Sequence, residues 1–356
     1  MARNGKMKAA IKAEPRPGIQ IGELPVPGIS PEEVLIRVKA VGICGSDVHI
    51  YEWTPGYEHL AEYMPVVLGH EFAGEVAEVG SQVSGVKVGD RVAYQGGSCG
   101  HCFYCITARH SLCDQRKAVG RVGLEKRGAM AEYVVANIQW ANLIPLPAGV
   151  SYEEASMSQP TAEALHMLEQ GEISLGDPVV VLGTGPIAVT VAQGAKAAGA
   201  SPVVVTGLSQ DRQRLSLAKS LGADMTIDVE KEDPVAKVKD MTNGLGAATV
   251  FEVSGSPQAF NQGLAMLRKG GTLVTFGIYP REISIDITRN VVREMKVIRG
   301  VYGASRTAWS KVLHFMASGQ IRVAPLITHR LPLERADEGF RACVERKAMK
   351  VILLPS

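Results

Sequence analysis

The pattern of apolar and polar positions divides the chain into two kinds of sequence. The first part, up to about residue 155, is rich in Gly and Pro, and its short apolar runs alternate or are bounded by turn residues, as at 34–38, 74–79 and 91–94. Runs of this kind predict the strands of a barrel or sandwich. We therefore expect the N-terminal part to form a β domain.

Farther along, continuous apolar runs alternate with helical patterns. Continuous apolar strands separated by helices predict a doubly wound parallel sheet that is buried on both faces. The C-terminal residues return to the mixed pattern, and 356 residues are too many for one ordinary core, so we expect two domains. The apolar runs lie at residues 179–182, 203–206, 249–253, 273–276 and 297–299.

Composition and charge exclude several classes of function. Apolar residues make up 46% of the chain, charged residues 21%, and the net charge is +2. So small a charge does not favour nucleic acid or an anionic membrane as a partner. The chain has no uninterrupted apolar run of membrane-spanning length, and no apolar signal core follows the basic residues Arg3 and Lys6. We expect a cytoplasmic protein, in which thiols stay reduced or bind metal.

Four cysteines form the densest chemical motif of the chain. Their spacing is C-x2-C-x2-C-x7-C, and four thiolates this close can surround one tetrahedral Zn²⁺. Disulfides are the weaker interpretation for a cytoplasmic chain. A closed four-sulfur site leaves no position for a substrate, so we expect this zinc to be structural. Cys343 has no partner by spacing and is interpreted as a buried apolar residue. The four proposed ligands are Cys99, Cys102, Cys105 and Cys113.

A glycine-rich turn predicts a dinucleotide site. The motif G-x-G-x-x-A begins at Gly183, follows the apolar run that ends at Leu182 and opens a helix. Its first glycine makes the tight turn, and Gly185 lets the backbone approach a pyrophosphate at the positive end of the helix. Pro186 and Ile187 begin that helix, so the strand before and the helix after support the interpretation.

The end of the next apolar run bears on the choice of cofactor. An acidic residue is expected there to bind the ribose 2′-hydroxyl of NAD, but this sequence has Gly207. Ser209, Arg212 and Arg214 follow and could hold a 2′-phosphate, although the arginines can equally belong to a solvated helix face. Asp211 is close enough to leave NAD possible. We therefore expect NAD(P), with a slight preference for NADP.

Three further residues suggest a second metal. Cys44 lies between glycines, and His70 and Glu71 follow Gly69. A thiolate, an imidazole and a carboxylate can fill three positions around zinc and leave the fourth open for water or substrate. We therefore expect two zinc ions per chain, one of them catalytic.

The segment Gly69-His70-Glu71-x2-Gly74-x5-Gly80-x2-Val83 resembles the zinc signature of the medium-chain, zinc-containing alcohol dehydrogenases. Residues 88–92 are also similar to that family, and the four-cysteine segment and the glycine-rich turn follow in the expected order. The resemblance implies an α/β protein with a GroES-like β-barrel catalytic domain and a doubly wound, parallel-sheet (Rossmann) coenzyme domain. The implied bounds are 1–160 with 303–356 for the catalytic domain, about 95–117 for its structural zinc lobe, and 161–302 for the Rossmann domain. The active site is then expected in the cleft between the two domains.

The resemblance also implies roles for individual residues. Cys44 and His70 become ligands of the catalytic zinc, and Glu71 becomes either a ligand or a neighbour that exchanges with water. Ser46 takes the proton of the substrate hydroxyl and His49 passes it towards solvent, while the substrate carbon gives hydride to the nicotinamide. The residues expected to contact the cofactor near the nicotinamide or from the catalytic domain are Phe276, Tyr302 and Lys350.

Details of the sequence narrow the branch of the family. Residues 48–53, 300–303 and 326–330 are similar to L-threonine 3-dehydrogenases, whose close relatives are sorbitol and butanediol dehydrogenases. Those branches carry Glu or Asp before a proline at the domain junction, where this chain has Gln159. Gln159 is a weak candidate ligand because a neutral amide binds zinc poorly. The substitution argues against assigning threonine as the substrate.

The expected function is hydride transfer between NAD(P) and a secondary alcohol of the polyol, diol or 3-hydroxy amino acid type, in a homotetramer. L-threonine 3-dehydrogenase proper is the alternative. A zinc-free double-bond reductase on the same fold would lack the Cys44 and His70 pair. A nucleic-acid-binding protein built around the four-cysteine lobe would use its basic residues, but the chain has no basic stripe. Those residues of the lobe are His101, Arg109, His110, Arg116 and Lys117.

Overall fold

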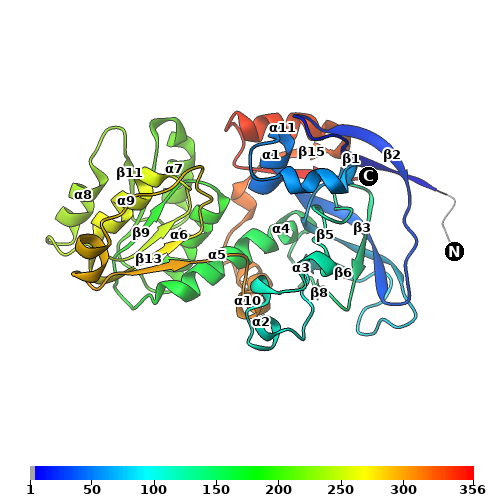
Figure 1. Ribbon diagram of the computed structural model, residues 1–356, viewed down its shortest axis with the longest axis horizontal. Coiled ribbons are helices and arrows are strands. Elements are labelled where there is room, and N and C mark those ends of the chain that lie inside the picture. The colour runs from blue at the N-terminus through cyan, green and yellow to red at the C-terminus, as the bar shows by residue number, and fades with distance from the viewer. Residues whose placement is uncertain (1–4) are drawn as a thin grey trace. The chain divides into compact units, whose positions relative to one another are not determined.

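The computed structural model describes residues 5–356, apart from the side chains of Arg116 and Lys117. Residues 1–4, which entered the prediction of a cytoplasmic protein, and the two basic side chains considered for nucleic acid lie outside the described part. Contacts divide the chain into two compact units (Figure 1). The first unit is Met1–Gln159 with Val323–Ser356, and the second is Pro160–Arg322.

The first crossing between the units differs from the sequence analysis by one residue, but the return to the first unit differs by twenty. The chain returns to the first unit at residue 323, whereas the sequence analysis placed this return at 303. The intervening helix α10 (Arg306–Ala317) belongs to the second unit because its ends are held there. The Ser305 hydroxyl donates to Glu169 Oε2 at 2.6 Å, and the Gln193 side chain exchanges hydrogen bonds of 3.2 and 2.9 Å with the Arg322 backbone.

Two sheets form the first unit. One has the order β2-β1-β4, and the other has seven strands in the order β15-β16-β3-β5-β6-β8, with β7 paired to β3. Strand β3 is the centre of the larger sheet because it pairs with β16, β5 and β7. The strands are β1 (Lys6–Lys12), β2 (Gln20–Pro25), β3 (Glu33–Gly42), β4 (Val66–Val67), β5 (Glu71–Val79), β6 (Arg91–Gln95), β7 (Tyr133–Asn137), β8 (Asn142–Pro145), β15 (Ile327–Pro332) and β16 (Lys350–Leu354).

Short helices connect these strands. A 3₁₀ turn precedes β4, and the segment between β6 and β7 carries the four cysteines (Figure 1). The helices and 3₁₀ turns are α1 (Gly45–Glu52), η1 (Glu58–Tyr63), α2 (Phe103–Ile106), η2 (His110–Leu112), α3 (Arg116–Val119), α4 (Tyr152–Ser156), η5 (Ala324–Leu326), η6 (Leu333–Arg335) and α11 (Ala336–Val344).

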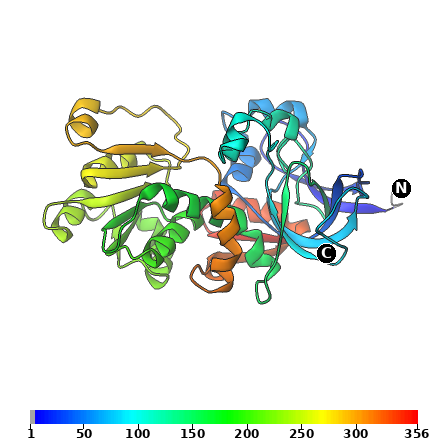
Figure 2. The same cartoon turned by 90° about the horizontal axis from the view of Figure 1, so that it is seen from below.

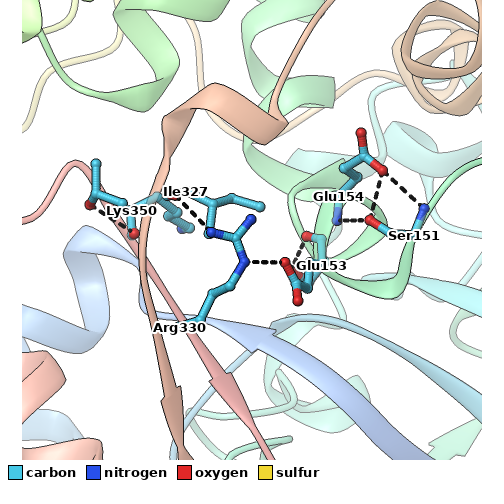
Figure 3. Close-up of polar contacts among 8 residues, drawn as sticks. Ser151, Glu153, Glu154, Ile327, Arg330 and Lys350 are labelled. Carbon is cyan, nitrogen blue, oxygen red and sulfur yellow. Dashed lines mark hydrogen bonds and ion pairs between the residues drawn. The ribbon is translucent and has the colours of Figure 1, made fainter.

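Polar contacts attach the C-terminal strands to the first unit (Figure 3). Arg330 of β15 pairs with Glu153 of α4 and donates to the Ile327 carbonyl at 3.2 Å. Helix α4 itself begins at a capping box in which Ser151 and Glu154 satisfy each other's backbone N–H groups at 3.1 and 3.0 Å. Strand β16 pairs with β3, so the C-terminal strands complete the sheet that carries Glu71 on β5.

The second unit is a six-stranded parallel sheet with the order β11-β10-β9-β12-β13-β14. Helices lie on both faces of this sheet (Figures 1 and 2). All four residues of β9 and all six of β12 are buried, as the continuous apolar runs predicted. Because the strand order reverses between β9 and β12, the switch point at which Rossmann sheets bind ligands lies beyond these two strands.

The elements of the second unit follow the expected alternation of strand and helix. They are α5 (Ser158–Gly171), β9 (Val179–Leu182), α6 (Pro186–Ala197), β10 (Val203–Gly207), η3 (Ser209–Asp211), α7 (Arg212–Ser220), β11 (Met225–Asp228), α8 (Pro234–Met241), β12 (Ala247–Glu252), α9 (Pro257–Met266), β13 (Leu267–Thr275), η4 (Thr288–Val292), β14 (Val297–Gly300) and α10. None of the helices between residues 5 and 356 has the length and apolar character needed to cross a bilayer.

Lys12 is a fully buried cation that ties a loop to helix α1. Its Nζ donates to the carbonyls of Gly18 and Tyr51 at 3.2 Å each and to that of Arg16, and it lies 5.6 Å from the centre of the Trp53 ring. Burial lowers the pKa of Lys12 to about 8. The three carbonyls keep the ammonium group hydrogen-bonded in place of water, so the end of α1 is held by a side chain from β1.

Lys12→Met should lower the free energy of unfolding by about 2–4 kcal/mol, because three carbonyls lose their partner. Lys8→Met is the matched control on the same strand, where the exposed lysine pairs with exposed Glu334 and should contribute less than about 1 kcal/mol. Denaturant unfolding measures both changes. Equal stability of the two variants would contradict the role assigned to Lys12.

Candidate functional site

Strand pairing brings three candidate metal ligands together. In the antiparallel pair β3–β5, Gly42 lies opposite Glu71, so Cys44, two residues past Gly42, reaches His70. The ligand atoms of Cys44, His70 and Glu71 all lie within 4.8 Å of one another. A thiol, an imidazole and a carboxyl group at this spacing fit the donor set of a zinc ion with one position left open.

Two glycines make room for this cluster. A Cβ at Gly42 would lie 2.6 Å from Glu71 Oε2 and 2.8 Å from Lys350 Cε. Gly69 has a φ of +94°, and a Cβ there would lie 2.8 Å from Met130 Cγ. The glycine before His70 in the sequence motif is therefore required by backbone conformation and by close packing.

Asp47 is a site residue that the sequence analysis missed. Its Oδ2 accepts the Cys44 N–H at 2.9 Å, and its Oδ1 lies 3.6 Å from His70 Nδ1. Both Asp47 Oδ1 and His70 Nδ1 are buried, and neither has a hydrogen-bond partner within the described part of the chain. Burial raises the pKa of Asp47, although His70 and the Cys44 N–H oppose this shift. A carboxylate at Nδ1 leaves Nε2 of the histidine for a metal, which is typical of zinc-binding histidines.

Glu71 and Lys350 form an ion pair in which both side chains are nearly fully buried. Lys350 Nζ also donates to the Ile43 carbonyl at 2.9 Å. Burial alone would lower the pKa of Lys350, but the Glu71 carboxylate outweighs it and the pKa is raised. The sequence analysis expected Lys350 to contact the cofactor, and this stays a prediction. Within the first unit, the ion-pair partner of Lys350 is Glu71, a candidate metal ligand.

The candidate proton-transfer residues lie on α1. This helix begins directly after Cys44, and Ser46 and His49 are three residues apart, so they share one face of it. His49 Nδ1 lies 3.2 Å from Thr54 Oγ1, and its ring stacks on Tyr57 at a centroid distance of 5.7 Å. Gln159, the weak ligand candidate, lies half-buried at the start of α5.

The four cysteines of the lobe converge on one point. Their ligand atoms lie within 4.8 Å of one another, with Sγ–Sγ distances of 3.4, 3.8 and 4.0 Å for three of the pairs. Sulfurs placed tetrahedrally about 2.3 Å from a zinc ion lie roughly 3.8 Å apart. The buried cluster formed by Cys99, Cys105, Cys113 and Val119 is small and separate from the main core. The spacing therefore fits a zinc ion, and the lobe has little apolar core of its own.

The contact between Cys102 and Cys105 shifts the pKa values of these two thiols in opposite directions. Burial opposes ionisation of Cys102, but the backbone N–H groups of Asp114 and Cys105 outweigh it and lower its pKa to about 6. Burial and the neighbouring Cys102 raise the pKa of Cys105 to about 12. A dication bound among these sulfurs would replace the thiol protons and stabilise all four thiolates.

The glycine-rich turn of the second unit has the predicted geometry. Gly183 has a φ of +126° and its N–H donates to the Thr206 carbonyl at 3.1 Å. Gly185 is the N-cap of α6, Pro186 is the first residue of this helix, and Ile187 follows it. The N-terminal N–H groups of α6 therefore follow a turn with glycine at both Gly183 and Gly185, which fits a pyrophosphate.

The register of the parallel strands places the remaining cofactor candidates at one edge of the sheet. Leu182, Glu252 and Thr275 are paired neighbours at the ends of β9, β12 and β13, so Phe276 begins at the same level. Gly300 of β14 pairs with Thr275, and Tyr302 follows it with 54% of its surface exposed. Gly207 ends β10 on the other side of β9, and Ser209 and Arg212 follow it.

Glu252 and Tyr279 form a second group that the sequence analysis missed. The fully buried Glu252 carboxylate accepts the Ser254 N–H at 2.8 Å and the Gly255 N–H at 3.1 Å, and the Tyr279 hydroxyl donates to it. Burial, with this carboxylate, raises the pKa of Tyr279. The network fixes the loop that follows β13, next to Phe276.

Comparison with known proteins identifies the family. A family model described as the alcohol dehydrogenase GroES-like domain matches residues 30–148, and one described as a zinc-binding dehydrogenase matches residues 186–318. L-threonine 3-dehydrogenase of Bacillus velezensis is 38% identical over 99% of this chain and 99% of its own. Sorbitol dehydrogenase of Halalkalibacterium halodurans is 36% identical over 98% of this chain and 99% of its own.

A solved structure agrees with this assignment. The crystal structure of a protein from Sinorhizobium meliloti 1021 bound to NADP covers 99% of this chain and 100% of its own, with 26% identity and a TM-score of 0.88. The chain belongs to the zinc-binding, medium-chain alcohol dehydrogenase family, which confirms the resemblance and the fold class predicted from the sequence. It is an oxidoreductase that transfers hydride between a secondary alcohol and NAD(P), as the sequence predicted.

Lys350→Met should lower the free energy of unfolding by about 3–5 kcal/mol, because it leaves the Glu71 carboxylate buried without a counter-charge. The double variant Glu71→Gln with Lys350→Met should recover part of that loss, since no buried charge remains. Lys347→Met is the control, because exposed Lys347 pairs with exposed Glu345. Denaturant unfolding at a fixed zinc concentration measures the series, and additive effects of the two site substitutions would contradict the coupling.

Proposed function

We propose that this chain is a zinc-dependent dehydrogenase of secondary alcohols that carry a neighbouring polar group, with two zinc ions per chain. The observation that carries the proposal is the convergence of Cys44, His70 and Glu71 within 4.8 Å. The four-cysteine cluster of the lobe supports the second, structural ion. The two clusters come from different segments of the first unit.

The residues of the chain have distinct roles in this proposal. Cys44 and His70 hold the catalytic ion, and Glu71 holds it or exchanges with water. When bound, zinc would polarise the substrate hydroxyl and the nicotinamide would supply a hydride acceptor. Ser46 accepts the hydroxyl proton and His49 passes it to solvent. Asp47 orients the imidazole of His70.

The second unit binds the dinucleotide in this proposal. The turn from Gly183 to Ile187 receives the pyrophosphate, and Phe276 and Tyr302 lie near the nicotinamide. Lys350 approaches the cofactor from the first unit.

The substrate is of the polyol, diol or 3-hydroxy amino acid type. Relatives named for L-threonine and for sorbitol support this class, because both substrates carry a secondary hydroxyl beside a polar group. L-threonine is the second candidate, supported by the 38% identity to a threonine dehydrogenase. Gln159 argues against it, because a neutral amide replaces the acid of that branch near the metal.

Cofactor preference, assembly and location extend the proposal. The missing acid at Gly207 and the exposed Arg212 support a slight preference for NADP.

A homotetramer is supported by apolar residues exposed near the sheet edge β14 and on the cysteine lobe. A cytoplasmic location is supported by the six cysteines, which form no disulfide in the described chain. The exposed apolar residues are Ile287, Val292, Met295, Val297, Phe103, Ile106 and Leu112.

Cys44→Ser should lower the bound zinc from two ions to one per chain and reduce kcat more than about 100-fold, since a hydroxyl is a far weaker zinc ligand than a thiolate. Metal analysis and cofactor-dependent absorbance with a panel of diols, polyols and L-threonine measure both effects. A chelator should abolish activity. Cys343→Ser, the control, should change neither value. Full activity of Cys44→Ser would contradict the metal assignment.

Cys102→Ser should also leave one zinc ion per chain, but its consequence is structural. We expect the thermal midpoint to fall by at least about 5 °C, because the lobe has little apolar core to replace the metal. The kcat of the enzyme that remains folded should change less than about threefold. A loss of turnover without a loss of stability would contradict a purely structural ion.

A further inference from the structure

The end of β10 lacks the acidic residue that usually binds the ribose 2′-hydroxyl. A Cβ at Gly207 would lie 2.5 Å from Thr184 Cγ2 and 3.2 Å from Leu215 Cδ2. Thr184 is buried inside the glycine-rich turn, so this turn fills the space where an acidic side chain would begin. An acid must therefore come from elsewhere if the site is to bind a 2′-hydroxyl.

Two carboxylates bind Ser209, two residues past Gly207: Asp228 at the end of the neighbouring strand β11 and Glu230 just after it. Asp228, the last residue of β11, pairs with Gly207 in the parallel register. Its Oδ2 accepts the Ser209 hydroxyl at 2.7 Å, and Glu230 Oε2 accepts the Ser209 N–H at 2.7 Å. The two donors of Ser209 that could hold a 2′-phosphate are thus already bound to acids.

The charges around Ser209 are not evenly balanced. Lys231 Nζ lies 2.7 Å from Asp228 Oδ2 and, together with the Ser209 hydroxyl, lowers the pKa of Asp228. Glu230 is exposed, and within the described part of the chain no ion pair is formed by its carboxylate. Arg212, also exposed, begins helix α7 three residues after Ser209. The exposed Glu230 carboxylate therefore binds the Ser209 backbone, while the exposed Arg212 side chain lies only three residues after Ser209 along the chain.

We propose that Glu230, with Asp228 behind it, is a determinant of cofactor choice that opposes Arg212. The inference rests on the proposed function, because it assumes that the Gly183 turn binds NAD(P). A 2′-phosphate carries up to two negative charges and is repelled by Glu230, whereas a 2′-hydroxyl can donate to its carboxylate. Arg212 attracts the same phosphate. Repulsion by Glu230 and attraction by Arg212 oppose each other, so the preference for NADP over NAD stays small.

Direct binding of NADP⁺ and NAD⁺ to the zinc-loaded protein tests this inference. Isothermal titration at fixed ionic strength gives the ratio Kd(NAD⁺)/Kd(NADP⁺). Glu230→Gln should raise this ratio about tenfold, and Glu230→Ala should move it in the same direction. Arg212→Ala should lower the ratio by a similar factor. Thermal midpoints close to that of the unchanged protein show that the exposed substitutions leave the fold intact.

Glu232→Gln is the matched control. It removes the same charge two residues away from Glu230, at a carboxylate that pairs with Lys237. An unchanged ratio in both Glu230 variants would overturn the inference. An equal rise of the ratio in Glu232→Gln would also overturn it, because the effect would then come from net charge alone. If the unchanged protein binds neither nucleotide, the proposed function itself is wrong and the inference falls with it. Binding of both nucleotides with an unaltered ratio refutes the inference alone.

Discussion

The antiparallel pairing of β3 with β5 is the constraint on which the candidate metal centre depends. It places Gly42 opposite Glu71, and the chain then needs only two more residues to bring Cys44 beside His70. Because side chains alternate along a strand, a slip of one residue would turn Glu71 to the opposite face and separate the ligands. Helix α1 begins at Gly45, directly after Cys44, so the same pairing also positions the candidate proton-transfer residues.

Buried charges around this pairing are matched with opposite charges or hydrogen bonds. Lys350 neutralises Glu71, and Lys12 is surrounded by carbonyl oxygens. Asp47 is the exception, because one of its oxygens faces His70 Nδ1 at 3.6 Å without a hydrogen bond. A cation bound by His70 would supply the missing positive charge. Among the described residues, the one buried acid with an oxygen that lacks a hydrogen-bond partner thus lies where the chemistry of the site requires it.

The second unit organises its site by strand order. Six parallel strands end at one edge, and the reversal of order between β9 and β12 opens that edge to a ligand. The glycine-rich turn, the Glu252 network and the carboxylates beyond β11 all follow strand ends at this edge. In our proposals cofactor binding and cofactor choice are therefore separate properties: the turn binds the pyrophosphate, and side chains that follow β10 and end or follow β11 set the choice.

Sequence alone was sufficient for the features that depend on local spacing. The cysteine cluster lies within one short segment, the glycine-rich turn joins consecutive elements, and the His70 motif is continuous, so chemistry and function class followed from the residues. Contacts between distant segments needed the tertiary structure, because no local pattern encodes them. These include the Glu71–Lys350 pair, the acids that bind Ser209, and the packing that keeps α10 with the second unit. Asp47 lies between the two cases: its capping position after Cys44 could be read from the chain, but its approach to His70 exists only once β5 has folded against β3.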